Sequence, residues 1–523
     1  MIDNKYDSIV VGSGAGGLTT AVALAQAGQR VLVCEQHYAP GGWTQSFVLN
    51  GYRFSPGVHY IGGLGPGEYL NQIYRGLGVS QNLEFIELNP NNFDHIFIGD
   101  EQFDIPKGKE KYIERLISRF PEEASGIRKL FQKIDDISLL MGSLPRGNFP
   151  LKKLRSIKWL WKSGGALINK YVNDPILRAI LKSQAGDHGV PPSKVSALVQ
   201  IGIMRHYFNG GFYPRGGAYI LPRAFIRTLK GAGGQIRLST PVKRIIVENG
   251  VAIGVEIGDG EKLFAKNIIS NADPETTFIK LIGKEHLSNK LNKKLSKVRY
   301  STSCLSLFLA VDLDLKSMGY DSGNYWYYNH SDLDKIYSLG QTDYAIHNSP
   351  PAMFMTITTL KDPSKMKKGV HTIEAFCFAN YEPFKKWEGE PQGERSKGYN
   401  TLKKEIMERM LNYLEKRVPG IKDSVVFKDL ATPLTNAHFI NSHDGNIYGT
   451  DKITKQIGPF GFNTKTEIKN LYLCGASTLS HGVAGVTGTG LRAAATILKC
   501  KTKDLLKQNS PELKISLCDN ISK

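Results

Sequence analysis

The chain has 523 residues, of which 41% are hydrophobic and 22% charged, an ordinary globular composition that excludes disordered and fibrous proteins. Lys and Arg number 67 against 48 Asp and Glu, so the net charge of +19 predicts an anionic partner, either nucleic acid or a membrane surface. No run of about 18 apolar residues occurs, which excludes a spanning helix, and the polar start predicts that no signal peptide is cleaved.

A strand–turn–helix–strand unit is predicted over residues 5–35. Residues 6–11 (YDSIVV) form a short apolar strand, and a glycine-rich turn follows it. Residues 18–26 are rich in Ala and Leu and favour a helix that ends at Gly28. Residues 30–34 (RVLVC) form the second strand, with Glu35 at its carboxyl end. The unit has the length and order of a dinucleotide-binding fingerprint.

The turn has the spacing GxGxxG. Gly12 permits the tight turn, Gly14 lets the backbone approach a pyrophosphate, and Gly17 lets helix and strand pack closely. Helix-start N–H groups favour the anion, and Glu35 can accept hydrogen bonds from ribose hydroxyls. A second glycine pair, Gly41 and Gly42, follows near the same pyrophosphate. The predicted cofactor-binding positions here are Gly12, Gly14, Ala15, Gly16, Gly17, Glu35, Gln36, Gly41, Gly42 and Trp43.

The middle of the chain alternates between helical and strand patterns. Helices are predicted at 110–120, 124–140 and 176–184. Asn-Gly at 249–250 and Asp-Gly at 259–260 predict hairpin turns between strands. The remaining predicted strands are 243–247, 252–257, 263–269, 304–311, 325–328, 352–358 and 372–378, and the remaining helix is 399–417.

A second glycine-rich segment follows a predicted strand at 471–475. The loop from Gly475 to Gly490 carries few bulky side chains and leads into a predicted helix at 490–498. Such a loop lets backbone N–H groups lie against a large flat cofactor. The predicted contacts are Gly475, Ala476, Gly485 and Val486.

Three further segments carry a family resemblance: GVHYIGG at 57–63, GDHGVPPS at 186–193 and YPRGG at 213–217. With both glycine motifs, they make residues 5–498 resemble the phytoene-desaturase-type FAD flavoproteins, which include carotenoid isomerases and retinol saturases. The three segments look most similar to the retinol saturase branch. Two positions depart from the FAD pattern: Trp43 stands where Arg is frequent, and Ala476-Ser477 stand where many members carry Asp.

The resemblance implies an α/β fold: a Rossmann-like FAD-binding domain of the glutathione-reductase type with an inserted α+β substrate domain. The FAD domain is expected to comprise 1–60, 195–300 and 425–505. The substrate domain is expected at 61–194, with a basic membrane-facing patch, and at 301–424, with an antiparallel sheet; 506–523 is expected to be a flexible tail. By position, Val242 matches the residue that faces the adenine, and His59 lies in a flavin-adjacent motif. His59, His206 and Tyr213 are the candidate proton donors of a polyene reaction.

The basic charge is concentrated between Arg146 and Lys170, where seven basic residues alternate with apolar and aromatic ones and no acid occurs. Tryptophans at the headgroup level and lysines on anionic lipid suit an interfacial segment. We therefore expect a peripheral membrane partner and no nucleic acid. Six cysteines without CxxC spacing favour a reducing, cytosolic setting and indicate no metal site.

The implied function is FAD-dependent saturation of one double bond of a retinol-like or carotenoid-like polyene. Cis–trans isomerisation or desaturation of a carotene precursor is the alternative, because the same motifs serve all three reactions. A flavin-bound lipid carrier without turnover is an alternative of another class. NAD(P)H acting directly on the flavin is one candidate electron donor, and a separate reductase is another, since no second GxGxxG unit is present.

Overall fold

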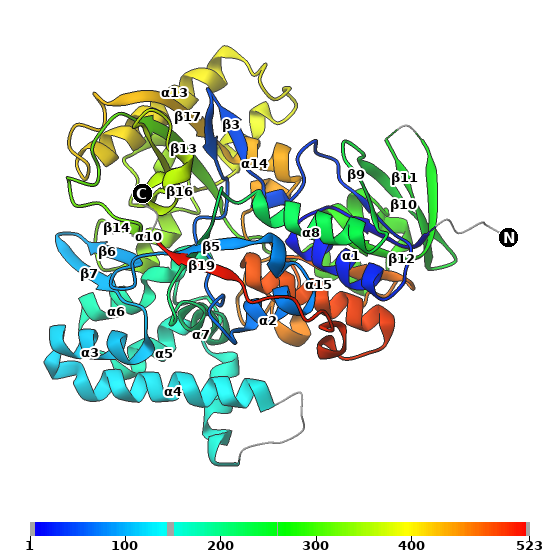
Figure 1. Ribbon diagram of the computed structural model, residues 1–523, viewed down its shortest axis with the longest axis horizontal. Coiled ribbons are helices and arrows are strands. Elements are labelled where there is room, and N and C mark those ends of the chain that lie inside the picture. Colours follow the sequence, from blue (N-terminus) through cyan, green and yellow to red (C-terminus); the bar gives the residue numbers. More distant parts are fainter. Residues whose placement is uncertain (1–5, 144–150, 259, 519–523) are drawn as a thin grey trace.

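The computed structural model describes residues 6–143, 151–258 and 260–518. Two seven-stranded sheets lie on opposite sides of the molecule (Figure 1). The first, called here the nucleotide sheet, has the order β10-β11-β12-β1-β2-β9, with β18 added beside β12. Its strands are β1 (Tyr6–Val11), β2 (Val31–Cys34), β9 (Gln235–Arg237), β10 (Val242–Glu248), β11 (Val251–Ile257), β12 (Lys262–Ser270) and β18 (Leu471–Leu473).

Both faces of the nucleotide sheet are covered, which is why the end of β1, residues 9–11, is apolar on both sides. Successive side chains of a strand point to opposite faces. Val10 packs against the helices of one face, while Ile9 and Val11 belong to the core of the other. The helices on the first face are α1 (Ala15–Gln26), α8 (Ile220–Gly231) and α15 (Gly482–Leu498). The parallel β12–β1–β2–β9 pairing confirms the predicted Rossmann-like sheet.

The second sheet, called the substrate sheet, has the order β17-β13-β16-β15-β14-β6-β7. Helix α13 (Lys397–Glu415) covers one of its faces. The strands of this sheet that fall within 301–424 pair antiparallel with one another, and β6, from an earlier part of the chain, adds to β14 in parallel. The strands are β6 (Asp94–Ile98), β7 (Glu101–Ile105), β13 (Ser303–Val311), β14 (Asn324–Tyr328), β15 (Ala352–Ile357), β16 (His371–Ala379) and β17 (Val425–Ala431).

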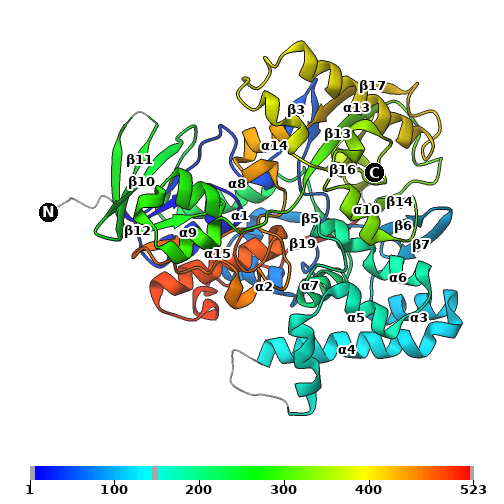
Figure 2. The same ribbon diagram turned by 180° about the vertical axis from the view of Figure 1, so that it is seen from behind.

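A group of helices packs on the other face of the substrate sheet and forms the lower part of Figures 1 and 2. It consists of α3 (Lys109–Arg119), α4 (Ala124–Ser143), α5 (Gly164–Tyr171), α6 (Pro175–Lys182) and α7 (Ala197–His206), with the 3₁₀ segments η5 (Leu151–Trp161) and η6 (Ser183–Asp187). The other helices are α2 (Tyr69–Gly76), α9 (Asn289–Leu295), α10 (Leu333–Leu339), α11 (Tyr344–His347), α12 (Thr358–Lys361) and α14 (Pro433–Ile440).

Three predicted boundaries differ from the structure. Helix α7 falls within the predicted FAD segment 195–300, yet its apolar residues pack in the core of the helical group. Strand β17 lies past the predicted boundary at 424 but pairs antiparallel with β13, so it belongs to the substrate sheet. Helix α15 begins at Gly482 rather than at Gly490, because its glycines let it cross α1 at backbone contact.

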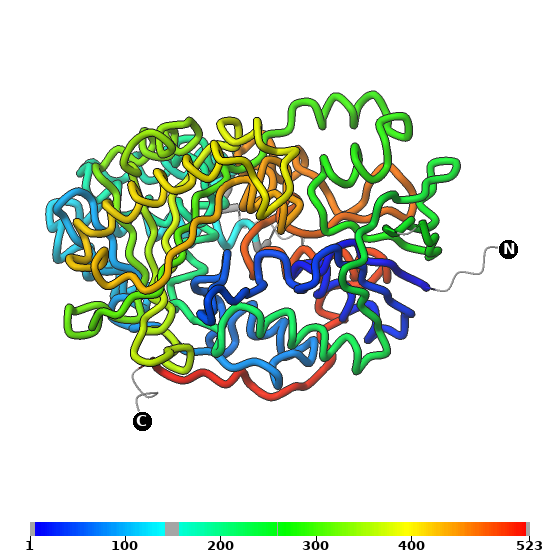
Figure 3. Tube along the Cα trace, turned by 90° about the horizontal axis from the view of Figure 1, so that it is seen from above, coloured from blue at the N-terminus to red at the C-terminus, as the bar shows by residue number. Residues whose placement is uncertain are grey.

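The predicted flexible tail is also wrong over its described part. Strand β19 (Lys514–Leu517) pairs in parallel with β5 (Glu84–Glu87), which in turn pairs with β8 (Phe212–Pro214). Leu513 is buried in the core beneath α1, so apolar contacts hold the segment in place. Figure 3 shows this red segment running along one side of the molecule, from the nucleotide side to the substrate side. A small hairpin, β3 (Phe47–Leu49) and β4 (Tyr52–Phe54), completes the strands described.

Candidate active site

A cavity with a volume of about 1110 Å³ lies between the two sheets. It is larger than most small-molecule sites, which span roughly 300–1,000 Å³. Its wall combines the glycine-rich turn after β1, the start of α15, one face of the substrate sheet and part of α7. The two chain segments predicted to bind one cofactor therefore meet at a single cavity.

The nucleotide end of the cavity is shaped by glycine backbones. A Cβ atom on Gly16 would lie 3.1 Å from both the Gly475 nitrogen and the Val486 oxygen. No side chain caps the start of α1 or of α15, so the first N–H groups of both helices remain available to an anion. This arrangement suits a pyrophosphate, as the sequence predicts.

Glu35 supplies the acidic group at the same end. Glu35 is only 8% exposed to solvent and lines the cavity. Its Oε2 accepts hydrogen bonds from Ser13 N at 2.8 Å and Ser13 Oγ at 2.6 Å, and its Oε1 accepts one from His37 N at 2.8 Å. A carboxylate has about four acceptor sites, so capacity remains for ribose hydroxyls. The contacts with Ser13 fix Glu35 relative to the glycine turn.

Nearly all of the predicted cofactor positions line the cavity. They are Gly12, Gly14, Ala15, Gly16, Glu35, Gln36, Gly41, Gly42, Trp43, His59, Val242, Gly475, Ala476, Gly485 and Val486. Gly17 is the exception, because it packs α1 on β1: a Cβ there would lie 2.2 Å from the Gly12 oxygen. The donor groups and the backbone spacing fit FAD. The binding role of each residue stays a prediction.

The loop at Ala476-Ser477 carries no Asp of its own, but a carboxylate from another part of the chain lies beside it. Asp273 lines the cavity, and its Oδ1 accepts a hydrogen bond from Ser477 Oγ at 2.5 Å. Its Oδ2 accepts from His443 N and from Asn446 Nδ2. The turn after β12 therefore brings to this loop the acidic group that the loop itself lacks.

The far end of the cavity has an aromatic floor. Trp326, Phe354 and Phe376 are directly opposite one another on β14, β15 and β16, so they form one row across the sheet. Their ring centroids are 4.6 and 4.9 Å apart. Because strand side chains alternate, Tyr325 and Tyr327 point the other way, into the core beside α13. Strand β14 thus contributes side chains both to the cavity and to the core beside α13.

The candidate donors His59 and His206 both reach the cavity. His59 Nδ1 lies 3.0 Å from Glu374 Oε2, and its ring stacks over Phe376 at 5.8 Å. His206 Nε2 accepts the N–H of Gly62 at 2.9 Å, and burial lowers the pKa of His206 to about 4. His206 is therefore neutral at physiological pH, and its accepting nitrogen is already engaged.

The third candidate, Tyr213, requires a correction. It is fully buried and is not among the described residues that line the cavity. Its hydroxyl accepts a hydrogen bond from Lys365 Nζ at 2.9 Å, and burial raises its pKa well above the usual value. The β8–β5 pairing turns this side chain away from the cavity, which residue type alone did not indicate.

A buried polar chain borders the cavity and was not anticipated from the sequence. Tyr60 Oη lies 3.0 Å from Asp187 Oδ2 and 3.3 Å from Asp94 Oδ2. Asp94 also accepts hydrogen bonds from Asn324 Nδ2 at 2.9 Å and Trp326 Nε1 at 3.2 Å. The segments at 60, 94, 187 and 324 are far apart in sequence and lack a common motif, so no spacing signal could have grouped them.

Asn324 also joins this chain to a buried lysine. Lys361 Nζ donates to Asn324 Oδ1 and to the His59 oxygen at 2.7 Å. Burial lowers the pKa of Lys361 to about 7 and raises that of Asp94 to about 6. The two groups are fully buried, and each favours the charged form of the other.

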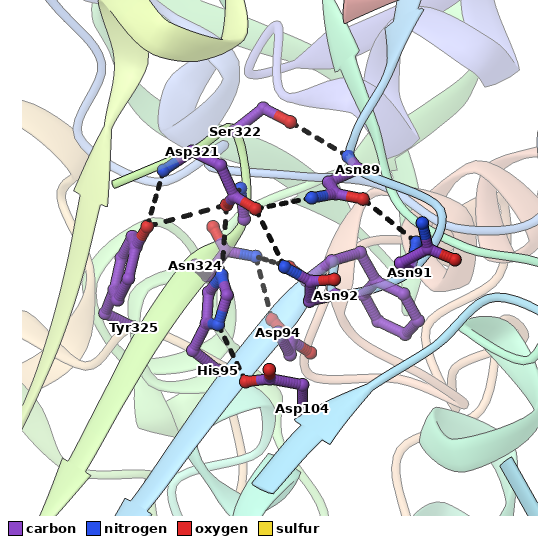
Figure 4. A network of polar contacts seen from close by, with 12 residues as sticks. Asn89, Asn91, Asn92, Asp94, His95, Asp104, Asp321, Ser322, Asn324 and Tyr325 are labelled. Atoms are coloured by element: carbon purple, nitrogen blue, oxygen red, sulfur yellow. Dashed lines mark hydrogen bonds and ion pairs between the residues drawn. The ribbon is translucent and has the colours of Figure 1, made fainter. Parts of the chain in front are cut away.

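A second polar network fixes the ends of β6 and β14 beside Asp94 (Figure 4). His95 lies between Asp104 Oδ1 at 2.8 Å and Asp321 Oδ1 at 3.0 Å. Burial alone would lower the pKa of His95, but these two hydrogen bonds raise it to about 9. The cationic ring stacks on Tyr325 at 4.6 Å. This network holds the strand segment that carries Asn324, and it lies outside the cavity wall.

Exposed apolar side chains gather where the cavity meets the surface. Four large apolar residues that line the cavity are more than a third exposed: Tyr69 at 60%, Met141 at 38%, Trp161 at 56% and Leu479 at 53%. Trp159, by contrast, is buried. The predicted patch before Ser156 falls partly outside the described residues, including Arg146 and Phe149. No helix in the described ranges has the length and hydropathy to cross a bilayer.

The family model for flavin-containing amine oxidoreductases matches residues 15–327. A zebrafish (Danio rerio) all-trans-retinol 13,14-reductase is 30% identical over 529 residues, covering 95% of this chain and 86% of that protein. A chloroplastic prolycopene isomerase from Arabidopsis thaliana is 30% identical over 514 residues, covering 94% and 82%. The predicted resemblance is thereby confirmed.

Solved structures support the fold alone. An oxidoreductase from Methanosarcina mazei superposes with a TM-score of 0.64 at 19% identity, covering 94% of this chain and 100% of that one. A putrescine oxidase bound to putrescine superposes with a TM-score of 0.63 at 15% identity, covering 94% and 99%. The overall arrangement of the fold is therefore shared with these two solved structures.

Proposed function

The chain belongs to the family of flavin-containing amine oxidoreductases, and we propose that it is an FAD-dependent enzyme that saturates one double bond of a retinol-like or carotenoid-like lipid. The observation that carries the proposal is the aromatic row of Trp326, Phe354 and Phe376, which lines one end of the cavity. The other end of the same cavity is the glycine cradle, formed by the glycine-rich turn after β1 and the start of α15. Flat apolar side chains suit a flat conjugated chain, and the similarity to retinol 13,14-reductases supports the same substrate class.

Reduced FAD, when bound, supplies the hydride that saturation of a double bond requires. The residues of this chain position the lipid and exclude water from it. The aromatic row supports one face of the conjugated chain, and His59 stacks beside Phe354 and Phe376 at the turn toward the cradle. Alignment of this kind contributes several kcal/mol to catalysis, on the order of 7–11 in the best intramolecular models.

The test uses purified protein carrying its flavin. The flavin is reduced with dithionite without oxygen, and all-trans-retinol is then added. We expect the oxidised flavin spectrum to return and a product heavier by two hydrogens to appear in mass spectrometry. A product of unchanged mass but altered retention supports isomerisation, which the 30% identity to prolycopene isomerases favours as second candidate. A lipid that binds without any change of flavin spectrum or product indicates a carrier and overturns the proposal.

We further propose that the mouth of the cavity docks on an anionic membrane, from which such a lipid enters. Trp161 is exposed on η5 and lies edge-on to Phe460, itself 50% exposed, at 6.0 Å. Lys158 and Lys162 flank Trp161 and are exposed. Aromatic rings at the headgroup level with nearby cations suit an interfacial surface.

Charge reversal at the mouth is expected to weaken vesicle binding. Each basic residue near an anionic surface contributes about 1 kcal/mol, so Lys158→Glu with Lys162→Glu should lower affinity at least tenfold. Sedimentation with phosphatidylserine-containing vesicles measures this. The matched control is Lys243→Glu with Lys262→Glu, two exposed lysines on the nucleotide sheet. Equal loss in both double variants would contradict docking at the mouth.

A further inference from the structure

Saturation of a double bond needs a proton as well as a hydride, and the polar chain beside the cavity contains a group suited to deliver it. Asp187 lines the cavity at the end of η6. Among the described residues, the only hydrogen-bond donor to its carboxyl group is Tyr60. This carboxyl therefore differs from Asp94, which has several donors.

The single hydrogen of the Tyr60 hydroxyl indicates that one of its two carboxyl neighbours is protonated. A tyrosine hydroxyl has a single hydrogen and can donate to one acceptor. Tyr60 Oη lies within hydrogen-bond range of both Asp187 and Asp94. If Tyr60 donates to one, the other contact is favourable only when that carboxyl donates to the tyrosine oxygen. Two carboxylates on one hydroxyl would repel each other.

The surroundings decide which carboxyl is the acid. Asp94 accepts hydrogen bonds from the N–H groups of Asn324, Trp326 and Gln184, at 2.9, 3.2 and 3.2 Å. These nitrogens are donors only, so they favour the ionised form of Asp94. Lys361, linked through Asn324, adds positive charge on the same side. These contacts stabilise the anion at Asp94. Burial and the nearby Asp94 charge, in that order, raise the pKa of Asp187 well above its usual value.

The backbone of Asp187 lies between the aromatic floor of the cavity and the start of α15. A Cβ on the preceding Gly186 would lie 2.0 Å from the Trp326 ring, so this backbone rests directly on the aromatic floor. On the other side, His481 at the start of α15 donates from Nε2 to the Asp187 backbone oxygen at 2.8 Å. Tyr448 Oη donates to the Gly186 oxygen at 2.7 Å. The segment is thereby fixed between the cradle and the floor.

Resting on the proposed saturation, we propose that Asp187 is the catalytic acid, that Tyr60 is a positioning residue, and that Asp94 is the fixed anion behind them. As the π bond breaks, one carbon forms a C–H bond with the hydride and its neighbour forms a C–H bond with the proton of Asp187. The electron pair of the Asp187 O–H bond stays on the carboxylate, which takes a new proton from water. A nicotinamide or dithionite supplies the two electrons lost with the hydride.

The first test needs no lipid. Infrared spectra of the flavin-loaded protein, with the flavin oxidised, should show the C=O stretch of a protonated carboxyl at neutral pH, and Asp187→Asn should remove it. Asp451→Asn is the matched control, because Asp451 is 3% exposed and lies outside the cavity wall. Loss of the band in Asp94→Asn but not in Asp187→Asn would overturn the assignment. This result stands whether or not the protein reduces a polyene.

The second test measures the reaction itself. General-acid catalysis contributes about 10²–10⁴-fold, so Asp187→Asn should lower turnover of all-trans-retinol at least about 100-fold. Flavin content, flavin reduction by dithionite and retinol affinity should stay at wild-type values. Tyr60→Phe keeps both carboxyls and should shift the infrared band while lowering turnover less. Turnover of Asp187→Asn equal to wild type would refute the role of Asp187, whereas an inactive wild type with the predicted band would refute only the proposed reaction.

Discussion

Replacing Gly490 by alanine is expected to give a protein that loses its flavin and about 2–3 kcal/mol of stability. The added Cβ would lie 2.2 Å from the Gly16 oxygen and 3.0 Å from Thr19 Cβ. The first contact is with backbone, so no side-chain rotation relieves it. Helix α15 must then move away from α1. The first residues of α1 and α15 then no longer face the same end of the cavity. Flavin absorbance after purification and thermal denaturation measure both effects.

The matched control is the same substitution at Gly231, the last residue of α8. A Cβ there meets no atom within 4 Å. Since alanine has the higher helix propensity, Gly231→Ala should keep the flavin and gain a few tenths of a kcal/mol. If Gly490→Ala were purified yellow and as stable as Gly231→Ala, the close crossing of α1 and α15 would not be what forms the cradle.

Replacing Lys361 by methionine should cost about 2–4 kcal/mol at pH 8, where the lysine is largely neutral. Methionine fills the same volume but leaves Asn324 Oδ1 and the His59 oxygen without their buried donor. Urea denaturation measures the loss. Lys316→Met, at an exposed lysine, is the control and should stay within about 0.5 kcal/mol of wild type.

The pH dependence of this variant has a definite sign. The folded pKa of Lys361, about 7, lies below the ordinary value of 10.5, so the unfolded chain binds more protons between these values. This group therefore makes the wild type gain stability as pH rises from about 7 to 10.5. Lys361→Met lacks that gain, and the difference in unfolding free energy should widen over this window. Parallel profiles would show that Lys361 keeps an ordinary pKa in the folded protein.

Local sequence patterns predicted the nucleotide half of the site well. The glycine spacing after β1, Glu35 after β2 and the glycine-rich stretch after β18 each depend on backbone geometry that a few adjacent residues determine. Their meeting at one cavity follows from the parallel pairing of β1, β12 and β18. The family resemblance supplied the Val242 position, which also lines the cavity.

The substrate half was less accessible to sequence reasoning. The resemblance of the YPRGG segment places Tyr213 near the flavin, whereas strand pairing decides which way its side chain points. Asp187 lies in the GDHGVPPS segment, yet its environment depends on Tyr60 and Asp94, which other strands and loops bring close to it. Long-range strand pairings, such as that of β6 with β14, bring these residues together, and no local sequence pattern encodes such pairings.

The nucleotide sheet is assembled from three separated stretches of chain, the last of which ends with α15. During translation, the amino-terminal βαβ unit leaves the ribosome while the residues that close the cradle are still unsynthesised. Cofactor capture is thus a late event in biogenesis, and the nascent chain must remain soluble with an open hydrophobic crevice until then. Riboflavin-limited cells should consequently accumulate this protein as an immature, protease-sensitive apoprotein.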